Sequence, residues 1–367
     1  MAIEDFSVER LIEEVFAPRP EDVFAVLVDR PARPGDDNPA WSDRRAMAEE
    51  WRQCLVAMGR EHGFRVLPLV AFQAVVEVNA ELPETAEMAG REVRLRDVLD
   101  EATAVIAMPE RSVTGPLMQF GKRKGAADKF RVASAPLANR SMEKTGFCAK
   151  QGDLVARGEV LMKAMEDAET MEVRFTTGDI CLFDLRYRKA EADNGYLHAD
   201  KEGPAFINLP SGEVWIVPYE GERKGEASRT AGVIPVAGEN GEIARFIVEE
   251  NRIVEVEGDG AHADALRRQI EVDPARRNVA EVAFGYNDKA RVVGIFIEDE
   301  KAGFHWGFGR SEFLGGTVGP DAFASLDAVM HLDLCYAREC PVTVSVDLIK
   351  AGGERLPVLR EGNYILW

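Results

Sequence analysis

The segment VMHLDLCY, residues 329–336, carries two polar side chains of metal-binding type inside an apolar run. Residues i and i+2 of a β-strand point to the same face of its sheet, so a strand here would present His331 and Asp333 together. Imidazole and carboxylate groups are common metal ligands, but they also form structural hydrogen-bonded pairs. By itself, the segment leaves a structural pair and a metal site equally open.

Three more side chains of these types interrupt apolar or glycine-rich runs: Glu213 in NLPSGEVWIVP, Glu281 in NVAEVAFGYN and His305 in IEDEKAGFHWGFG. A carboxylate is rarely buried without a partner, because the loss of its hydration is costly. Taken singly, each residue favours a structural role: a solvent-facing position or an ion pair with Arg291 or Arg338 for the glutamates, and a structural hydrogen bond for the histidine. Taken together with the first pair, they give two histidines and three carboxylates, the usual ligand set of a dinuclear metal site.

The first part of the chain has the pattern of an α/β domain. The apolar runs DVFAVLVDR and FRVLPLVAF predict buried strands, and they alternate with helical spacing in FSVERLIEEVF and RRAMAEEWRQCLVAMGREHG. LRDVLDEATAVIAMP then predicts a helix followed by a strand. Alternation of this kind favours a mostly parallel sheet with helices packed on it.

From about residue 168 the pattern becomes β-rich. AETMEVRFTTGDICLFDLRYRK, EVWIVPYEGE, EIARFIVEENRIVEVEG and RVVGIFIEDE all predict strands, and GAHADALRRQIEV predicts one helix among them. We therefore expect an N-terminal parallel-sheet α/β domain over residues 1–165. A β-rich α+β metal-binding and catalytic domain is expected to follow over residues 166–367, so the candidate ligands all fall in the second domain.

Composition narrows the class of protein. The formal net charge of −19 argues against nucleic acid or an anionic membrane as a partner, because both would repel the chain. No apolar run is long enough to span a bilayer, and the acidic N-terminus is unlike a signal peptide. Five scattered cysteines suit reduced thiols, so a cytoplasmic location is expected. The sequence carries neither G-x-G-x-x-G after a strand nor a P-loop motif.

Four motifs resemble, in order and approximate spacing, those of the thermophilic metallo-aminopeptidase family: NLPSGEVWIVP, AEVAFGYNDKA, EDEKAGFHWGFG and HLD. The resemblance covers mainly the C-terminal 200 residues or so. It implies that two divalent ions, Zn²⁺, Mn²⁺ or Co²⁺, are held by Glu213, Glu281, His305, His331 and Asp333. It further implies a hydrolase that uses metal-activated water to cleave a peptide or a small-molecule amide, and a homodimer.

Two positions depart from the family pattern. Glu312 stands where the family has a tyrosine, and Lys301 replaces the asparagine of the Asp-Glu-Asn motif. A hydrolase of this type needs a carboxylate that takes a proton from the water, and Glu312 and Glu300 are the two candidates.

The same superfamily contains ring-cleaving dihydroxypyridine dioxygenases, which this chain resembles at LPSG and HLD. That resemblance implies the alternative of one Fe(II) held by two histidines and one carboxylate. In those enzymes a histidine stands at the position of Glu281, and the positions of Glu213 and His305 are apolar. The glutamate at 281 therefore favours the two-metal hydrolase over the dioxygenase. A non-catalytic metal-binding relative is the third alternative.

Overall fold

The computed structural model describes residues 6–76, 78–125, 129–200 and 205–367. The chain forms two compact units. Unit 1 comprises residues 1–155, 193–211 and 288–290, and unit 2 comprises residues 156–192, 212–287 and 291–367. Each unit is thus built from separate stretches of the chain, and all five candidate ligands belong to unit 2.

Unit 1 is built on a mostly parallel sheet with the strand order β11-β7-β6-β1-β3-β4-β5, in which β2 also pairs with β1. Its strands are β1 (Val23–Arg30), β2 (Arg65–Val66), β3 (Val70–Gln73), β4 (Thr85–Met88), β5 (Arg91–Arg94), β6 (Ala104–Met108), β7 (Arg131–Ser134) and β11 (Ala205–Asn208). β4 and β5 extend one edge in antiparallel fashion. The α/β class predicted for this part of the chain is confirmed.

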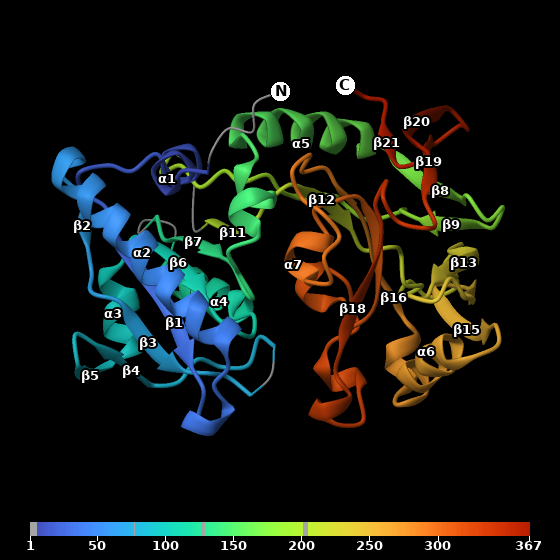
Figure 1. Cartoon of the computed structure of the whole chain (residues 1–367). Coiled ribbons are helices and arrows are strands. Elements are labelled where there is room, and N and C mark those ends of the chain that lie inside the picture. The colour runs from blue at the N-terminus through green and yellow to red at the C-terminus, as the bar shows by residue number, and fades with distance from the viewer. Residues whose placement is uncertain (1–5, 77, 126–128, 201–204) are drawn as a thin grey trace. The chain divides into compact units, whose positions relative to one another are not determined.

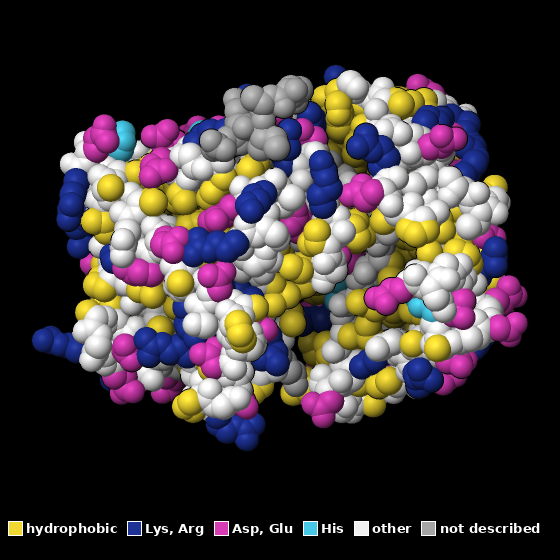
Figure 2. All heavy atoms as spheres, viewed as in Figure 1, with side chains coloured by type: hydrophobic (Ala, Val, Ile, Leu, Met, Phe, Trp, Pro, Cys, Tyr) yellow, Lys and Arg dark blue, Asp and Glu magenta, His cyan; other side chains and the backbone are white. Residues whose placement is uncertain are grey.

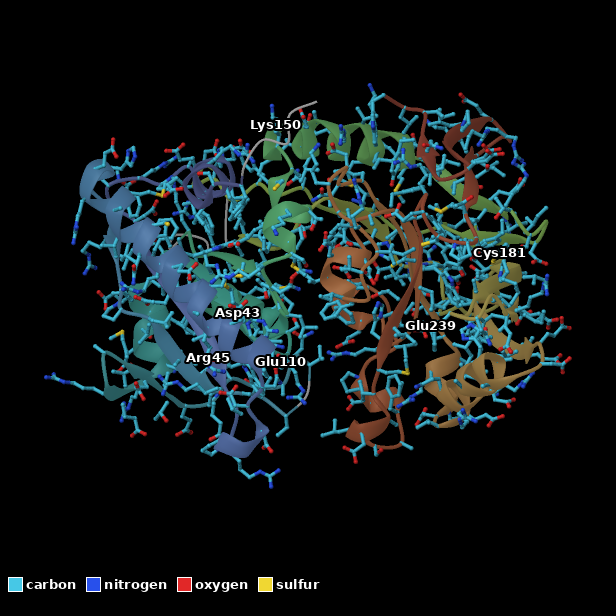
Figure 3. All side chains as sticks on the ribbon, viewed as in Figure 1. Asp43, Arg45, Glu110, Lys150, Cys181 and Glu239 are labelled. Carbon is cyan, nitrogen blue, oxygen red and sulfur yellow. The ribbon has the colours of Figure 1, made fainter. Side chains whose placement is uncertain are left out.

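The helices of unit 1 are α1 (Val8–Phe16), α2 (Pro39–His62), α3 (Leu95–Glu101) and α4 (Thr114–Lys124). α2 is amphipathic: Trp51 and Leu55 are buried, whereas Asp43 and the half-buried Arg45 lie on its polar side (Figure 3). It begins at an asparagine cap, where the Asn38 side chain accepts a hydrogen bond from Trp41 N. A further helix, α5 (Gln151–Met165), contains the boundary between the units and was not predicted from the sequence.

Unit 2 contains two antiparallel sheets (Figure 1). The first has the order β10-β12-β16-β17-β18, with β10 (Glu191–Asp193), β12 (Glu213–Ile216), β16 (Val279–Gly285), β17 (Phe304–Gly309) and β18 (His331–Tyr336). The second has the order β15-β14-β13-β9-β8-β19-β20-β21. Its strands are β8 (Ala168–Phe175), β9 (Ile180–Asp184), β13 (Ala231–Ala237), β14 (Ile243–Glu249), β15 (Arg252–Glu257), β19 (Val344–Lys350), β20 (Arg355–Arg360) and β21 (Asn363–Tyr364).

The two sheets of unit 2 share an aromatic core. Phe246 of β14 lies 5.4 Å from Trp306 and 5.6 Å from Phe308 of β17, measured between ring centroids. Trp306 Nε1 donates a hydrogen bond to Tyr336 Oη, and the Tyr336 hydroxyl donates to Pro235 O. Because side chains alternate along a strand, this packing on one face of β17 leaves His305 and Gly307 on the other face.

Two predicted strands differ from the structure. FRVLPLVAF is divided into β2 and β3, because Pro68 between them has no N–H to donate to a strand ladder. RVVGIFIEDE forms a turn and the short helix α7 (Phe296–Asp299) instead of a strand. There the Asp299 carboxylate accepts hydrogen bonds from Val293 N and Gly294 N, which takes these donors away from any ladder. The helix predicted by GAHADALRRQIEV is confirmed as α6 (Ala261–Glu271).

The structure also shows the state of the cysteines and the distribution of surface charge. No disulfide joins any of the five cysteines, all of which the structure describes, and Cys181, labelled in Figure 3, is buried in β9. Figure 2 shows basic side chains interspersed with acidic ones on the viewed face, despite the net charge of −19. Within the described residues, no helix combines the length and the apolar character needed to cross a bilayer.

Candidate metal centre

One row of residues crosses three neighbouring strands of the smaller sheet, up to its edge strand β18. Glu281 of β16 pairs with Gly307 of β17, and Gly307 pairs with Asp333 of β18. Directly paired residues in an antiparallel sheet share a face, so the two carboxylates lie on one face with a glycine between them. His331 enters the same face from β18, two residues before Asp333.

A β-bulge sets the direction of Glu281. The pairing of β16 with β17 shifts between Val279 and Glu281, where Val279 pairs with Phe308 and Glu281 with Gly307. Val279 therefore faces the aromatic core, whereas Glu281, two residues later, faces away from it. Without the bulge, both residues would point to the same side of the sheet.

Gly307 leaves space for an ion between the acidic side chains. A Cβ atom at this position would lie 2.5 Å from Asp333 Oδ1 and 2.8 Å from His331 Nε2. The space above Gly307 is therefore a cradle that any larger residue would fill, and it is lined by a carboxylate and an imidazole.

The five candidate ligands form two groups that share Glu281. In the first group, His305 Nε2 lies 3.7 Å from Glu213 Oε2 and 3.7 Å from Glu281 Oε1. In the second group, His331 Nε2 lies 3.0 Å from Glu281 Oε2 and 3.0 Å from Asp333 Oδ1. The two oxygens of Glu281 are thus divided between the two histidines.

The distances in the first group suit a shared ion better than direct hydrogen bonds. A hydrogen bond between these atoms would measure about 2.7–3.2 Å. Two ligands of one tetrahedral ion lie about 3.4 Å apart when each metal–ligand bond is about 2.1 Å. In addition, Glu213 Oε2 is buried and has no hydrogen-bond partner among the described residues. The donor set and this orphaned oxygen therefore fit a divalent metal.

Both histidines are oriented through their second ring nitrogen. Nδ1 of His331 lies 2.7 Å from Arg310 O, and Nδ1 of His305 lies 3.3 Å from Gly303 O. A backbone carbonyl can only accept, so Nδ1 carries a proton, and Nε2 is the nitrogen that faces the carboxylates. Metal-binding histidines are commonly fixed by such a contact.

The clustered carboxylates favour positive charge on the histidines between them. Burial alone would lower the pKa of His305, but Glu281 and Glu213 outweigh it and raise that pKa to about 9. The pKa of His331 is likewise raised, since Asp333 and Glu281 outweigh the effect of burial. Burial opposes ionisation of Glu281, yet its contacts with His305 and His331 lower its pKa to about 2. In the ion-free protein, protons on the histidines therefore supply the charge that a metal would bring.

Lys301 is a fully buried cation beside this cluster. Its Nζ lies 2.6 Å from Glu213 Oε1 and 2.7 Å from Glu300 Oε1. The sequence offered Arg291 or Arg338 as ion-pair partners for the buried glutamates, whereas Glu213 pairs with Lys301. Burial is the main reason why the pKa of Glu300 is raised to about 8.

The two candidate proton acceptors differ in their surroundings. Glu300 is buried and joins the ligand cluster through Lys301 and Glu213. Glu312 opens the 3-10 helix Glu312–Leu314, and both its carboxylate oxygens pair with the guanidinium of Arg310. Glu312 is also more exposed, so the geometry separates two residues that the sequence treated alike.

The structure thus brings together all five predicted ligands and adds two residues to their surroundings. In the sequence, Gly307 is only one of several glycines near His305. Its position two residues after His305 could have placed it on the same face of a strand as that histidine. Lys301 was noted as a departure from a motif, but nothing in the sequence indicated that its ammonium reaches Glu213. Their roles as metal ligands and neighbours of the ion stay predictions.

Comparison with solved structures shows that the whole fold is shared. The 2,5-dihydroxypyridine dioxygenase from Pseudomonas putida KT2440 matches with a TM-score of 0.63 and 16% identity, over 98% of this chain and 96% of the other. Wild-type AmpT from Thermus thermophilus matches with a TM-score of 0.58 and 15% identity, over 98% of each chain. A search of curated proteins found no significant match.

The family comparison covers the part of the chain that contains the site. The sequence profile described as thermophilic metalloprotease (M29) matches residues 156–364, which include all five candidate ligands. This match spans more than half of the chain, and the fold of AmpT is consistent with it. The chain is therefore a metallohydrolase of the thermophilic metalloprotease (M29) family.

Proposed function

We propose that this protein is an aminopeptidase-like hydrolase that uses metal-activated water to cleave the amide bond of a short peptide or a small molecule. The observation that carries the proposal is the division of the two Glu281 oxygens between His305 and His331. One carboxylate placed in this way can bridge two ions. We therefore propose two positions for Zn²⁺, Mn²⁺ or Co²⁺, one in each ligand group.

The chain's own residues provide the remaining steps. Ions bound here would lower the pKa of a shared water towards about 7 and stabilise the oxyanion that develops on the amide carbonyl. We place the acceptance of the water proton on Glu300, because this carboxylate is buried and joins the ligand cluster through Lys301 and Glu213. Glu312 is the second candidate, since its carboxylate is more exposed and pairs with Arg310 instead of joining the ligand cluster.

The ligand types favour hydrolysis over the ring-cleaving alternative. Non-haem Fe(II) oxygenases hold their ion with two histidines and one carboxylate. Among the described residues, each candidate group instead contains one histidine and two carboxylates. Such oxygen-rich sites with a shared carboxylate suit Zn²⁺ or Mn²⁺ pairs that activate water.

Metal analysis and amide hydrolysis together test this function. The purified protein is stripped of metal and reloaded with Zn²⁺, Mn²⁺, Co²⁺ or Fe²⁺, and each form is assayed with aminoacyl anilides and small aromatic amides. We expect metal-dependent hydrolysis that EDTA abolishes. Oxygen uptake with a dihydroxypyridine, together with one Fe per chain and no amide cleavage, would instead establish the dioxygenase. A chain that binds no metal would be a non-catalytic relative.

We further propose a cytoplasmic homodimer without nucleic-acid or membrane partners. The support is the composition and the family resemblance described above. Light scattering coupled to gel filtration measures the mass of the particle in solution, and a monomer at micromolar concentration would refute the dimer.

A further inference from the structure

Lys301 places an ammonium group against one of the two ligand groups. Its ammonium contacts Glu213 Oε1 at 2.6 Å, while Glu213 Oε2 is the oxygen directed at His305. A buried ammonium is rare unless it is paired, and here Glu300 supplies a second contact at 2.7 Å. One end of the Glu213 carboxylate is therefore occupied before any ion arrives.

The backbone around Lys301 is fixed against the strand pair that carries Glu213. Gly285 is the cross-strand partner of Glu213, and a Cβ atom on Gly285 would lie 2.1 Å from Glu300 O and 2.6 Å from Lys301 C. Lys301 N also donates to Glu298 O, and Asn287 N donates to Lys301 O, each at 3.0 Å. The close approach permitted by Gly285 holds the lysine beside Glu213.

The two ligand groups consequently differ in charge. The group of Glu281, His331 and Asp333 offers two carboxylates, and no contact with a lysine or arginine side chain is found for them among the described residues. The group of Glu213, Glu281 and His305 also has two carboxylates, but the ammonium of Lys301 contacts one of them, Glu213, and shares its charge with Glu300. Ion affinity rises steeply with the net negative charge of the ligands, and a cation a few ångströms away opposes a second cation.

We propose that Lys301 makes the two ion positions unequal, so that the His331–Asp333 group holds one ion tightly and the Glu213–His305 group holds a second ion weakly. The protein as isolated then carries about one ion per chain. The second ion binds only at a higher metal concentration, so the fraction of protein with both positions occupied depends on the concentration of free metal. This inference rests on the proposed function, because it assumes that both groups bind metal.

Metal retention and calorimetric titration test whether the two ion positions differ in affinity. The metal-free protein is loaded with excess Zn²⁺, desalted and analysed by mass spectrometry of the metal, and a parallel sample is titrated with Zn²⁺ in a calorimeter. The wild type should retain about one ion after desalting, with a second Kd at least about 100-fold higher. Lys301→Met removes the charge and keeps the length of the side chain. This variant should retain about two ions, and the ratio of its two Kd values should be smaller than that of the wild type by at least about tenfold.

Control variants separate the charge of Lys301 from other effects. Lys350→Met removes the same charge from β19 of the other sheet and should behave as wild type. If Lys301→Met does not fold, two further variants test the order of filling. Glu213→Ala should keep the tight ion, and Asp333→Ala should lose it.

The outcomes distinguish the inference from the function on which it rests. Two ions with Kd values within about tenfold of each other in the wild type would overturn the inference and leave the hydrolase intact. A ratio of the two Kd values in Lys301→Met equal to that of the wild type would also overturn the inference and leave the hydrolase intact. A wild-type chain that binds no ion at either group would overturn the proposed function itself.

Discussion

Replacing Gly307 by alanine would put a methyl group into the space between Glu281 and Asp333. The new Cβ would lie 2.5 Å from Asp333 Oδ1, whereas ordinary contact begins at 3.4 Å. The carboxylate oxygen must therefore move by about 0.9 Å. Metal–ligand distances tolerate only about 0.2 Å, so the displaced oxygen can no longer serve as a ligand without further rearrangement.

The size of the effect follows from the loss of one ligand. Changes in groups that merely support a ligand cost about 10–100-fold in metal affinity, so loss of a carboxylate ligand should cost at least about 100-fold. This corresponds to about 2.8 kcal/mol of binding free energy. The fold should survive, because the methyl meets only the mobile ends of two side chains. Alanine also favours a strand over glycine by roughly 0.5–1 kcal/mol.

The assay compares Zn²⁺ affinity and metal-free thermal stability in Gly307→Ala, Gly152→Ala and the wild type. Gly152 is a matched control because a Cβ there would meet nothing within 4 Å. We expect a large loss of affinity in Gly307→Ala alone, with a metal-free Tm at or slightly above that of the wild type. Wild-type affinity in Gly307→Ala would refute the placement of an ion above this glycine.

Three further predictions concern ligands, pH and packing. At saturating metal, His331→Ala and Glu213→Ala should each lower the metal content per chain; unchanged content in both would contradict the ligand assignment. The charge of His305, whose pKa of about 9 exceeds the ordinary value of 6.5, stabilises the metal-free fold fully below about pH 6.5 and is lost as pH rises through 9. Glu300, with its pKa raised to about 8 chiefly by burial, acts in the same direction. Thermal scans in EDTA should therefore show a Tm that falls from pH 6.5 to 9, while the increase in Tm on adding Zn²⁺ grows; an increase independent of pH would contradict this linkage. Finally, Phe246→Ala should lower the free energy of unfolding by about 3–5 kcal/mol, because Phe246 is fully buried against Trp306. Val254→Ala, at an exposed position, should stay within about 0.5 kcal/mol of wild type, and equal effects in urea unfolding would refute the role of the aromatic core.

Much of the fold could be predicted because local patterns determine it. The strand β1, buried except for its last residue, the amphipathic α2 and the change to β-structure at Ala168 all follow from the pattern of apolar residues. The wrong prediction over residues 291–300 has the opposite origin. Its apolar residues match a strand, but Asp299 binds backbone N–H groups that the strand would need, and only the folded chain shows this contact.

The candidate site, too, was determined partly by the sequence and partly by the tertiary structure. The sequence by itself determined the types and order of Glu213, Glu281, His305, His331 and Asp333, and the strand period placed the last two on one face. Only the tertiary structure decided that they converge. The bulge before Glu281 turns that carboxylate away from the core, and the register of β16, β17 and β18 aligns it with Gly307 and Asp333. Register and bulges depend on pairing between strands distant in sequence, so no local pattern encodes them. The contact of Lys301 with Glu213 has the same physical basis, because it joins residues 88 positions apart and depends on the pairing of Glu213 with Gly285, which Lys301 approaches closely.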